Sequence, residues 1–273
     1  MYYFMSNIHG NYSGYEKMKE KIGFSDQDHL YVIGNIFDGN TQYPEDCIKI
    51  LDDIIYTPNI ELILGDHEFY YIMYYISGSQ FTKKQYEQKI QLLKPAGKAL
   101  FDYLNNIISN ENREDIFLKL IRECELSQMI KIGKRYFYLV NGSPVFKEEY
   151  KNDEQWQEML ASETIKLSKD YRKEILSDTN VKEYSSDLKN AEIIIISGNS
   201  VMEMYGDNPS IVSEQMIGKY KWYQRIIYKN NKIILNCGCR ADKYYPELIA
   251  TLACLCIDEK KEEFSVVYGY DLF

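Results

Sequence analysis

The sequence predicts an α/β fold, in which helices cover the faces of β-sheets. Short apolar segments of strand length alternate with longer segments whose apolar residues recur at helical spacing. The composition is that of a globular protein, with 45% hydrophobic and 27% charged residues in a chain of 273. This length suits one large domain, or one domain that carries an insertion. We therefore expect residues 1–273 to form a single domain with a helical insertion at about 82–129.

The predicted strands are short runs of apolar residues, many of them aromatic or β-branched. They are expected at residues 2–6, 30–34, 60–65, 135–140, 192–197, 232–235, 249–257 and 264–270.

The predicted helices lie between these strands. Residues 12–23 place Tyr15, Met18 and Ile22 on one face and end at Gly23, while residues 43–55 carry Pro44 in the first turn. Residues 69–76 are apolar all round, which is typical of a buried helix. Residues 82–129 are amphipathic and predict a helical cap, and residues 146–190 are again mostly helical.

Charge and targeting signals narrow the class of protein. The net charge of −9 argues against nucleic acid and anionic membranes as partners, because both require a basic surface. No apolar run reaches 18 residues, and no secretion signal is recognisable. We therefore expect a cytoplasmic protein with reduced cysteines. The pairs Cys237/Cys239 and Cys254/Cys256 each share one face of a strand, which favours core packing over a four-sulfur zinc site.

Polar residues end six of the predicted strands: Asn7, Asn35, Asp66, Asn141, Asn199 and Asn236. Asparagine is a common turn former, so any one of these positions is explained by a turn. In α/β sheets, however, ligand sites form outside the carboxyl ends of the strands, and His9 and His67 follow two of these residues closely. The set as a whole indicates a functional site.

The chain resembles the calcineurin-like metallophosphoesterases, especially the branch with serine/threonine protein phosphatases and bacterial dinucleoside-tetraphosphatase-like enzymes. The family's ordered blocks GDxHG, GDxxDRG, GNHE, HAG and GHT are similar to "SNIHG" (6–10), "GNIFDGN" (34–40), "GDHE" (65–68), "VNG" (140–142) and "SGN" (197–199). The resemblance extends over nearly the whole chain. It implies two facing mixed β-sheets flanked by helices, with the strand-end residues converging on one pocket.

The resemblance also implies a pair of divalent metals, which in the family activate a hydroxide for attack on phosphorus. The positions that correspond to the family's metal ligands are Asn7, His9, Asn35, Asp66, Asn141 and Asn199. Only His9 keeps the residue of the family. One carboxylate, Asp66, remains to offset the charge of two cations, so the binuclear centre is not expected to form. At most one weakly bound divalent metal, such as Mn²⁺ or Mg²⁺, is expected near His9 and Asp66.

A second part of the family site is retained. Asp38 and His67 correspond to an Asp–His pair that in the phosphatase branch protonates the leaving group. The family's phosphate-binding arginine is Gly39 here. The pair has a purely structural interpretation as well, in which Asp38 satisfies a buried imidazole and holds two loops together.

Three hypotheses follow. The first is a pseudophosphatase with a binding or regulatory role, whose partner is an unknown protein or a phosphorylated small molecule. The second is an active phosphoesterase with an atypical or single-metal site, or one in which Asp38 and His67 act alone. The third is a zinc protein organised by the cysteines.

Overall fold

The computed structural model describes residues 1–38, 42–77, 95–142, 193–198, 226–229, 232–235, 252–261 and 263–269. The first sheet has the order β10-β9-β1-β2-β3 and the second the order β4-β5-β6-β8-β7. The first is built from β1 (Tyr2–Met5), β2 (His29–Ile33), β3 (Ile60–Ile63), β9 (Ala253–Asp258) and β10 (Glu263–Tyr268). The second is built from β4 (Ser127–Ile132), β5 (Arg135–Val140), β6 (Ile193–Ser197), β7 (Ile227–Lys229) and β8 (Lys232–Ile234).

Both sheets are mixed. In the first, β1, β2 and β3 run parallel while β9 and β10 are antiparallel to their neighbours. In the second, β5, β6 and β8 are parallel and the outer strands β4 and β7 are antiparallel. Parallel neighbours end at the same edge of a sheet, so the loops after β1, β2 and β3 lie together.

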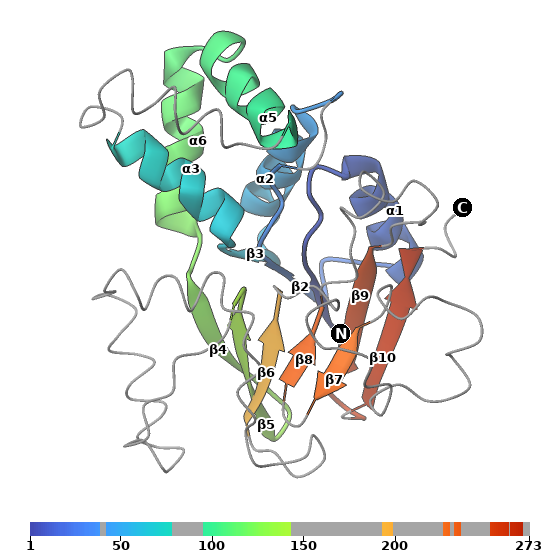
Figure 1. Ribbon diagram of the computed structural model, residues 1–273. Coiled ribbons are helices and arrows are strands. Elements are labelled where there is room, and N and C mark those ends of the chain that lie inside the picture. Colours follow the sequence, from blue (N-terminus) through green and yellow to red (C-terminus); the bar gives the residue numbers. More distant parts are fainter. Residues whose placement is uncertain are drawn as a thin grey trace, which may run out of the picture.

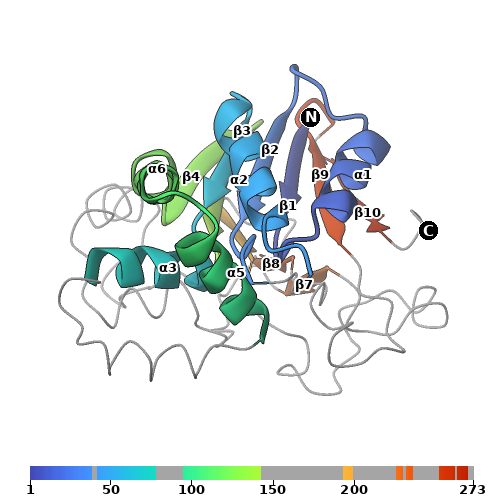
Figure 2. The ribbon, with the colours of Figure 1, turned by 90° about the horizontal axis from the view of Figure 1, so that it is seen from above.

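The described helices contribute to the core on one side of the first sheet, and the second sheet packs on its other face (Figure 1). They are α1 (Tyr12–Ile22), α2 (Asp46–Tyr56), α3 (Asp66–Ser77), α5 (Pro95–Asn106) and α6 (Asn110–Glu123). Seen from above, α3, α5 and α6 form a group beyond the β3 edge (Figure 2), and α6 contacts both α3 and α5.

Two apolar cores follow from the alternation of side chains along the strands. In β1, Phe4 points into the core between the sheets, whereas Tyr3 and Met5 point into the core under the helices. The predicted arrangement of two facing mixed sheets flanked by helices is thereby confirmed. Cys254 and Cys256 share the helix side of β9, as the sequence predicts, while Cys237 and Cys239 lie outside the described residues.

A few predicted boundaries were wrong. The helical insertion predicted to 129 ends at Glu123, and its last residues belong to β4. Strand β4 was missed because its residues alternate poorly and most of them are only half-buried, as suits the end strand of a sheet. Strand β7 was also missed, being only three residues long. Residues 82–94 and the predicted helices at 146–190 lie outside the described residues.

The connection between the sheets runs beside β3. Glu125 pairs with the β3 edge through the Leu64 N–H to Glu125 carbonyl bond of 2.7 Å, and the chain then enters β4. The Gln128 amide adds a 2.9 Å bond to Glu61. No helix in the part of the chain that the structure describes is long and apolar enough to cross a bilayer.

Candidate functional site

The loops that follow β1 and β2 continue the parallel pairing of these strands. The backbone N–H of Asn7 donates to the Gly34 carbonyl at 3.0 Å, and that of His9 donates to the Asn35 carbonyl at 2.9 Å. A third bond joins the Gly10 N–H to the Ile36 carbonyl at 2.8 Å. The two loops therefore form one hydrogen-bonded unit.

Left-handed backbone conformations concentrate in this unit. Among the described residues, the only non-glycine positions with positive φ are Asn7 (53°), His9 (49°), Asn35 (60°) and Asp38 (66°). Such conformations are unfavourable for side chains with a Cβ, although Asn and Asp tolerate them best. Strained backbone of this kind clusters at functional sites. All four residues are positions that the resemblance marked.

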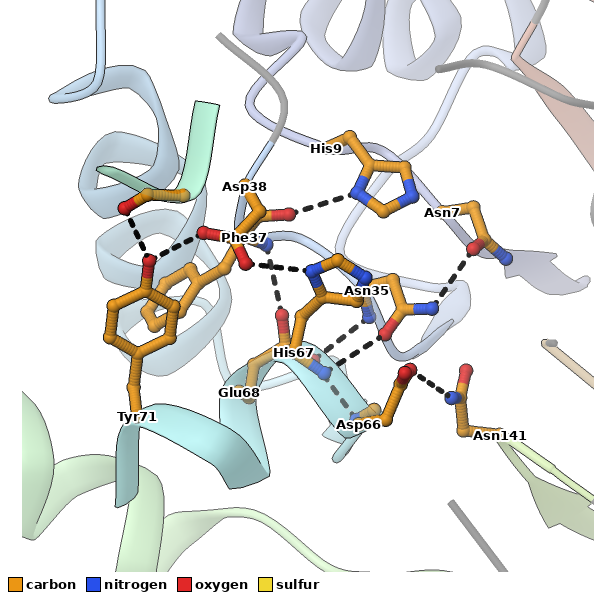
Figure 3. Close-up of polar contacts among 12 residues, drawn as sticks. Asn7, His9, Asn35, Phe37, Asp38, Asp66, His67, Glu68, Tyr71 and Asn141 are labelled. Carbon is orange, nitrogen blue, oxygen red and sulfur yellow. Dashed lines mark hydrogen bonds and ion pairs between the residues drawn. The ribbon is translucent and has the colours of Figure 1, made fainter. Parts of the chain in front are cut away.

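The amides of Asn7 and Asn35 form a directed chain of hydrogen bonds (Figure 3). Asn7 Nδ2 donates to the Gly198 carbonyl and, at 2.7 Å, to Ser6 Oγ. A carbonyl only accepts, so the orientation of the Asn7 amide is fixed and its Oδ1 faces Asn35. Asn35 Nδ2 donates to that oxygen at 3.0 Å. The Asn35 Oδ1 atom in turn accepts weakly from the His67 N–H at 3.5 Å.

Glycines at the strand ends leave the space that these amides fill. A Cβ on Gly65 would lie 2.1 Å from Asn35 Oδ1. A Cβ on Gly34 would lie 2.4 Å from Asn141 Oδ1, and one on Gly198 would lie 2.6 Å from the same atom. No side chain larger than hydrogen fits at these contacts, so the close approach of the loops requires glycine.

Glu68 connects the loop after β2 to the loop after β3. Its side chain is fully buried and accepts three backbone N–H groups at 2.9 Å, from Asn35, Phe37 and Gly65. Burial raises the pKa of the Glu68 carboxyl, although the neighbouring His67 and the three hydrogen bonds oppose this. The residue fixes the loop that carries Asn35 and Asp38.

Asp38 and His67 form the expected pair (Figure 3), with His67 Nδ1 lying 2.8 Å from Asp38 Oδ2. Because a carboxylate only accepts, the shared hydrogen belongs to Nδ1. Burial of the ring opposes its protonation, but the bond to Asp38 and the charges of Asp66 and Glu68 outweigh it, so the pKa of His67 is raised.

The remaining predicted residues lie around this centre. His9 Nδ1 is 2.9 Å from the Phe37 carbonyl, and the His9 ring meets the His67 ring edge to face at 5.0 Å between centroids. Asn141 Nδ2 donates to Asp66 Oδ1 at 3.4 Å, which is a long hydrogen bond. Helix α3 begins at Asp66, three residues before the predicted start, so Asp66 lies at its N-terminus, where the helix dipole favours a carboxylate.

Two of the six strand-end residues, and one further position of the resemblance, cannot be placed in this site. Asn199, Asn236 and the position Gly39 lie outside the described residues. The ends of β1, β2, β3, β5 and β6 do converge, because Asn7 contacts Gly198 and Asn141 contacts Asp66.

The described residues do not fit a pair of divalent metals. Where the family has two anionic ligands, Asn7 and Asn35 are neutral and bond to each other. No group of three or more His, Cys, Asp or Glu side chains able to hold a metal occurs within the described ranges. Amide oxygens can ligate hard cations but add no charge against the repulsion between two of them. A single metal near His9 and Asp66 stays a prediction.

Sequence reasoning overlooked three residues of the site. Glu68 was within the quoted "GDHE" block, but only the structure shows its three backbone acceptor contacts. Tyr71, whose hydroxyl is 2.5 Å from Asp38 Oδ1, lies one helical turn after His67 in a tyrosine-rich run. Its spacing of four from His67 was the available signal. Ser6, which bonds the Gly198 carbonyl at 3.1 Å, had no distinguishing signal.

Three known structures follow a similar course of the chain, each at low sequence identity. A protein assigned provisionally as a diadenosine tetraphosphatase matches 98% of this chain and 93% of its own, with 13% identity and a TM-score of 0.47. A metallophosphoesterase from Sphaerobacter thermophilus matches 98% and 86%, with 13% identity and a TM-score of 0.45. A serine/threonine phosphatase from Saccharomyces cerevisiae, similar to human phosphatase PP5, matches 98% and 78%, with 12% identity and a TM-score of 0.47.

Comparison with the curated proteins gives no match. The family model described as calcineurin-like phosphoesterase, by contrast, matches residues 2–209. This match takes in the loops after β1, β2, β3, β5 and β6, which carry the residues described above. Because it covers most of the 273 residues, the protein belongs to the calcineurin-like phosphoesterase family.

Proposed function

We propose that this protein is a catalytically degenerate member of its family, a pseudophosphatase with a binding or regulatory role. The observation that carries the proposal is the hydrogen bond between Asn35 Nδ2 and Asn7 Oδ1. At these two positions the family holds the carboxylates that ligate and bridge its metals. Here the side chains are neutral, and they satisfy each other without a cation.

The replacements are coherent in physical terms. Asn7 and Asn35 are each only 2% exposed. A carboxylate at such a position requires a nearby cation, whereas an amide requires only hydrogen-bond partners. The directed chain from Gly198 through Asn7 to Asn35 supplies those partners. Asparagine therefore keeps the shape of the former ligand loops while removing their need for metal.

The retained Asp38–His67 pair does not restore hydrolysis by itself. Hydrolysis of a phosphate ester at neutral pH needs an activated water, and a bound metal lowers the pKa of water to about 7. General acid catalysis alone contributes about 10²–10⁴-fold, far less than enzymes achieve with phosphate esters. The pair is better suited to binding. His67 has a raised pKa and a side chain that is 21% exposed, so it can present a cationic N–H donor to a phosphorylated small molecule.

The test is a phosphatase assay on metal-stripped protein, with Mn²⁺, Mg²⁺ and Zn²⁺ each titrated back. The substrates are an aryl phosphate and a bis-aryl phosphodiester, and the control is the His9→Ala, Asp66→Ala double variant. We expect the natural chain and the double variant to give the same background rate. Robust turnover that the double variant loses would overturn the proposal and establish the alternative, an active phosphoesterase with an atypical or single-metal site.

A further inference from the structure

The carboxylate of Asp38 is held from both sides. Its Oδ2 atom accepts from His67 Nδ1 at 2.8 Å, and its Oδ1 atom accepts from the Tyr71 hydroxyl at 2.5 Å. The residue is 6% exposed and has a left-handed backbone with φ of 66°. Each carboxylate oxygen therefore accepts a hydrogen bond from a protein donor. The left-handed backbone of Asp38 is intrinsically unfavourable, so these contacts hold the residue in place.

His67 and Tyr71 reach Asp38 from the same element. They are four residues apart on α3, and residues at this spacing share a helix face. Tyr71 is 1% exposed, and its ring meets the ring of Phe37 edge to face at 5.4 Å. Figure 3 shows the two α3 side chains converging on Asp38. The helix thus presents an imidazole and a phenol to one carboxylate, with the phenol locked by packing.

The hydroxyl of Tyr71 also connects the site to α5. It lies 2.9 Å from the Gly97 carbonyl, which is in the first turn of α5, as well as 2.5 Å from Asp38. A phenol has one hydrogen, so its two acceptors compete for it. Gly97 itself lies against the carboxylate, since a Cβ at this position would be 3.3 Å from Asp38 Oδ1 and 3.4 Å from its Cγ. The position of α5 therefore bears directly on Asp38.

We infer that Tyr71 is the positioning residue of the Asp38–His67 pair, and that it couples the orientation of His67 to the docking of α5. When α5 lies as in this structure, the phenol holds Oδ1 and leaves Oδ2 for the imidazole. When α5 moves, the contact of Gly97 with the carboxylate opens, and the Tyr71 hydroxyl no longer shares its hydrogen with the Gly97 carbonyl. The carboxylate can then shift with the phenol, and the orientation of the His67 ring bonded to it shifts as well. This role is independent of the proposed loss of hydrolysis, because it concerns only these side chains and α5.

The test removes the hydroxyl and keeps the ring. In the Tyr71→Phe variant, NMR of the imidazole nitrogens reports whether His67 keeps its hydrogen on Nδ1 and whether that hydrogen stays protected from solvent exchange. The chain has three histidines, so the signals can be assigned by replacing each in turn. We expect the protected Nδ1–H signal of the natural chain to be lost or broadened in Tyr71→Phe.

Tyr15→Phe is the matched control. Tyr15 is also fully buried, and its hydroxyl also donates to a carboxylate, that of Asp53, at 2.7 Å. This pair joins α1 to α2 and does not touch the site. Loss of a buried phenol hydroxyl is common to both variants, so only Tyr71→Phe is expected to change the His67 signal. An identical His67 signal in the two variants would overturn the inference.

A second variant, Gly97→Ala, tests the coupling to α5 without touching Tyr71. Alanine favours helix over glycine, so the change should stabilise α5 if the helix were unconnected to the site. The added methyl instead meets Asp38, and we expect it to shift the His67 ring signals. If Gly97→Ala is more stable and its His67 signals are unchanged, the coupling between α5 and His67 is refuted. This result is decisive even if the Tyr71→Phe variant does not fold.

Discussion

The amide pair of Asn7 and Asn35 and the ionic pair of Asp38 and His67 lie on the same loops, yet they differ in charge. The amides stand at positions where the family holds metal ligands, and they bond to each other at 3.0 Å. Asp38 and His67 keep the family's residues and bond at 2.8 Å. A buried charge is stable where another protein group balances it, whereas a buried amide needs only hydrogen-bond partners. Under the proposed function, the two pairs show this one rule acting on two halves of a site.

Glu68 supports both halves, and its loss should have the largest effect on stability. Glu68→Ala leaves three buried N–H groups without their acceptor, those of Asn35, Phe37 and Gly65. Each such group costs about 1–3 kcal/mol, so we expect the free energy of unfolding in urea to fall by at least ~3 kcal/mol. Glu68→Gln, which keeps an acceptor oxygen, should cost less. A change below ~0.5 kcal/mol in Glu68→Ala would show that the loops do not depend on this carboxylate.

Asn35→Asp tests the amide half. The change removes the donor to Asn7 Oδ1 and places a carboxylate 3.0 Å from that oxygen, at a position that is 2% exposed. We expect a loss of about 2–3 kcal/mol in the free energy of unfolding, measured in urea without metal.

The control for this change is Asn11→Asp. Asn11 caps α1 by accepting from the Gly14 N–H at 3.0 Å, and aspartate caps a helix equally well. This variant should stay within ~0.5 kcal/mol of the natural chain. If Asn35→Asp and Asn11→Asp lower the free energy of unfolding equally, the buried amide pair has no special requirement for a neutral side chain.

The Asp38–His67 pair should make the free energy of unfolding depend on pH. The folded protein holds His67 with a raised pKa, so this residue stabilises the fold fully below the unfolded value of about 6.5. That contribution is lost as the pH rises through the higher folded value. Urea unfolding between pH 6 and 8 should show a decline in stability that Asp38→Asn abolishes, because the mutant removes the partner that raises the pKa. A decline of the same size in Asp38→Asn would assign it to other groups.

Asp66→Asn should have the smallest effect of these changes. The residue begins α3, and its contact with Asn141 is long, at 3.4 Å. Loss of a negative charge at a helix N-terminus costs about 0.3–1 kcal/mol, which thermal unfolding can resolve. A loss of more than ~2 kcal/mol would show that Asp66 contributes more to the fold than its place at the helix N-terminus and its long contact with Asn141 explain.

The fold and most site positions could be predicted because they depend on local patterns. Apolar runs that end in polar residues marked β1, β2 and β3, and the order of the blocks marked the site. The half-buried, poorly alternating pattern of β4 and the shortness of β7 left no comparable signal, since edge strands need neither strict alternation nor length.

The hydrogen-bond partners could not be predicted. "FYYIMYYI" holds four tyrosines at adjacent turns of one helix, and only the placement of α5 distinguishes Tyr71, through Gly97. The direction of the Asn7–Asn35 chain likewise depends on the Gly198 carbonyl, which is 191 residues away in sequence from Asn7. Contacts of this range are set by the packing of the two sheets and are absent from any local pattern.

The most direct test of the proposed loss of the metal centre is a calorimetric titration of metal-stripped protein with Mn²⁺. The natural chain is compared with a variant that rebuilds the family's ligands: Asn7→Asp, Asn35→Asp, Asp66→Asn, Asn141→His and Asn199→His. We expect two ions to bind to the rebuilt variant and at most one, weakly, to the natural chain, because only the rebuilt site carries the anionic charge that two cations require. Binding of two ions per natural chain, with dissociation constants below about 1 μM, would contradict the account.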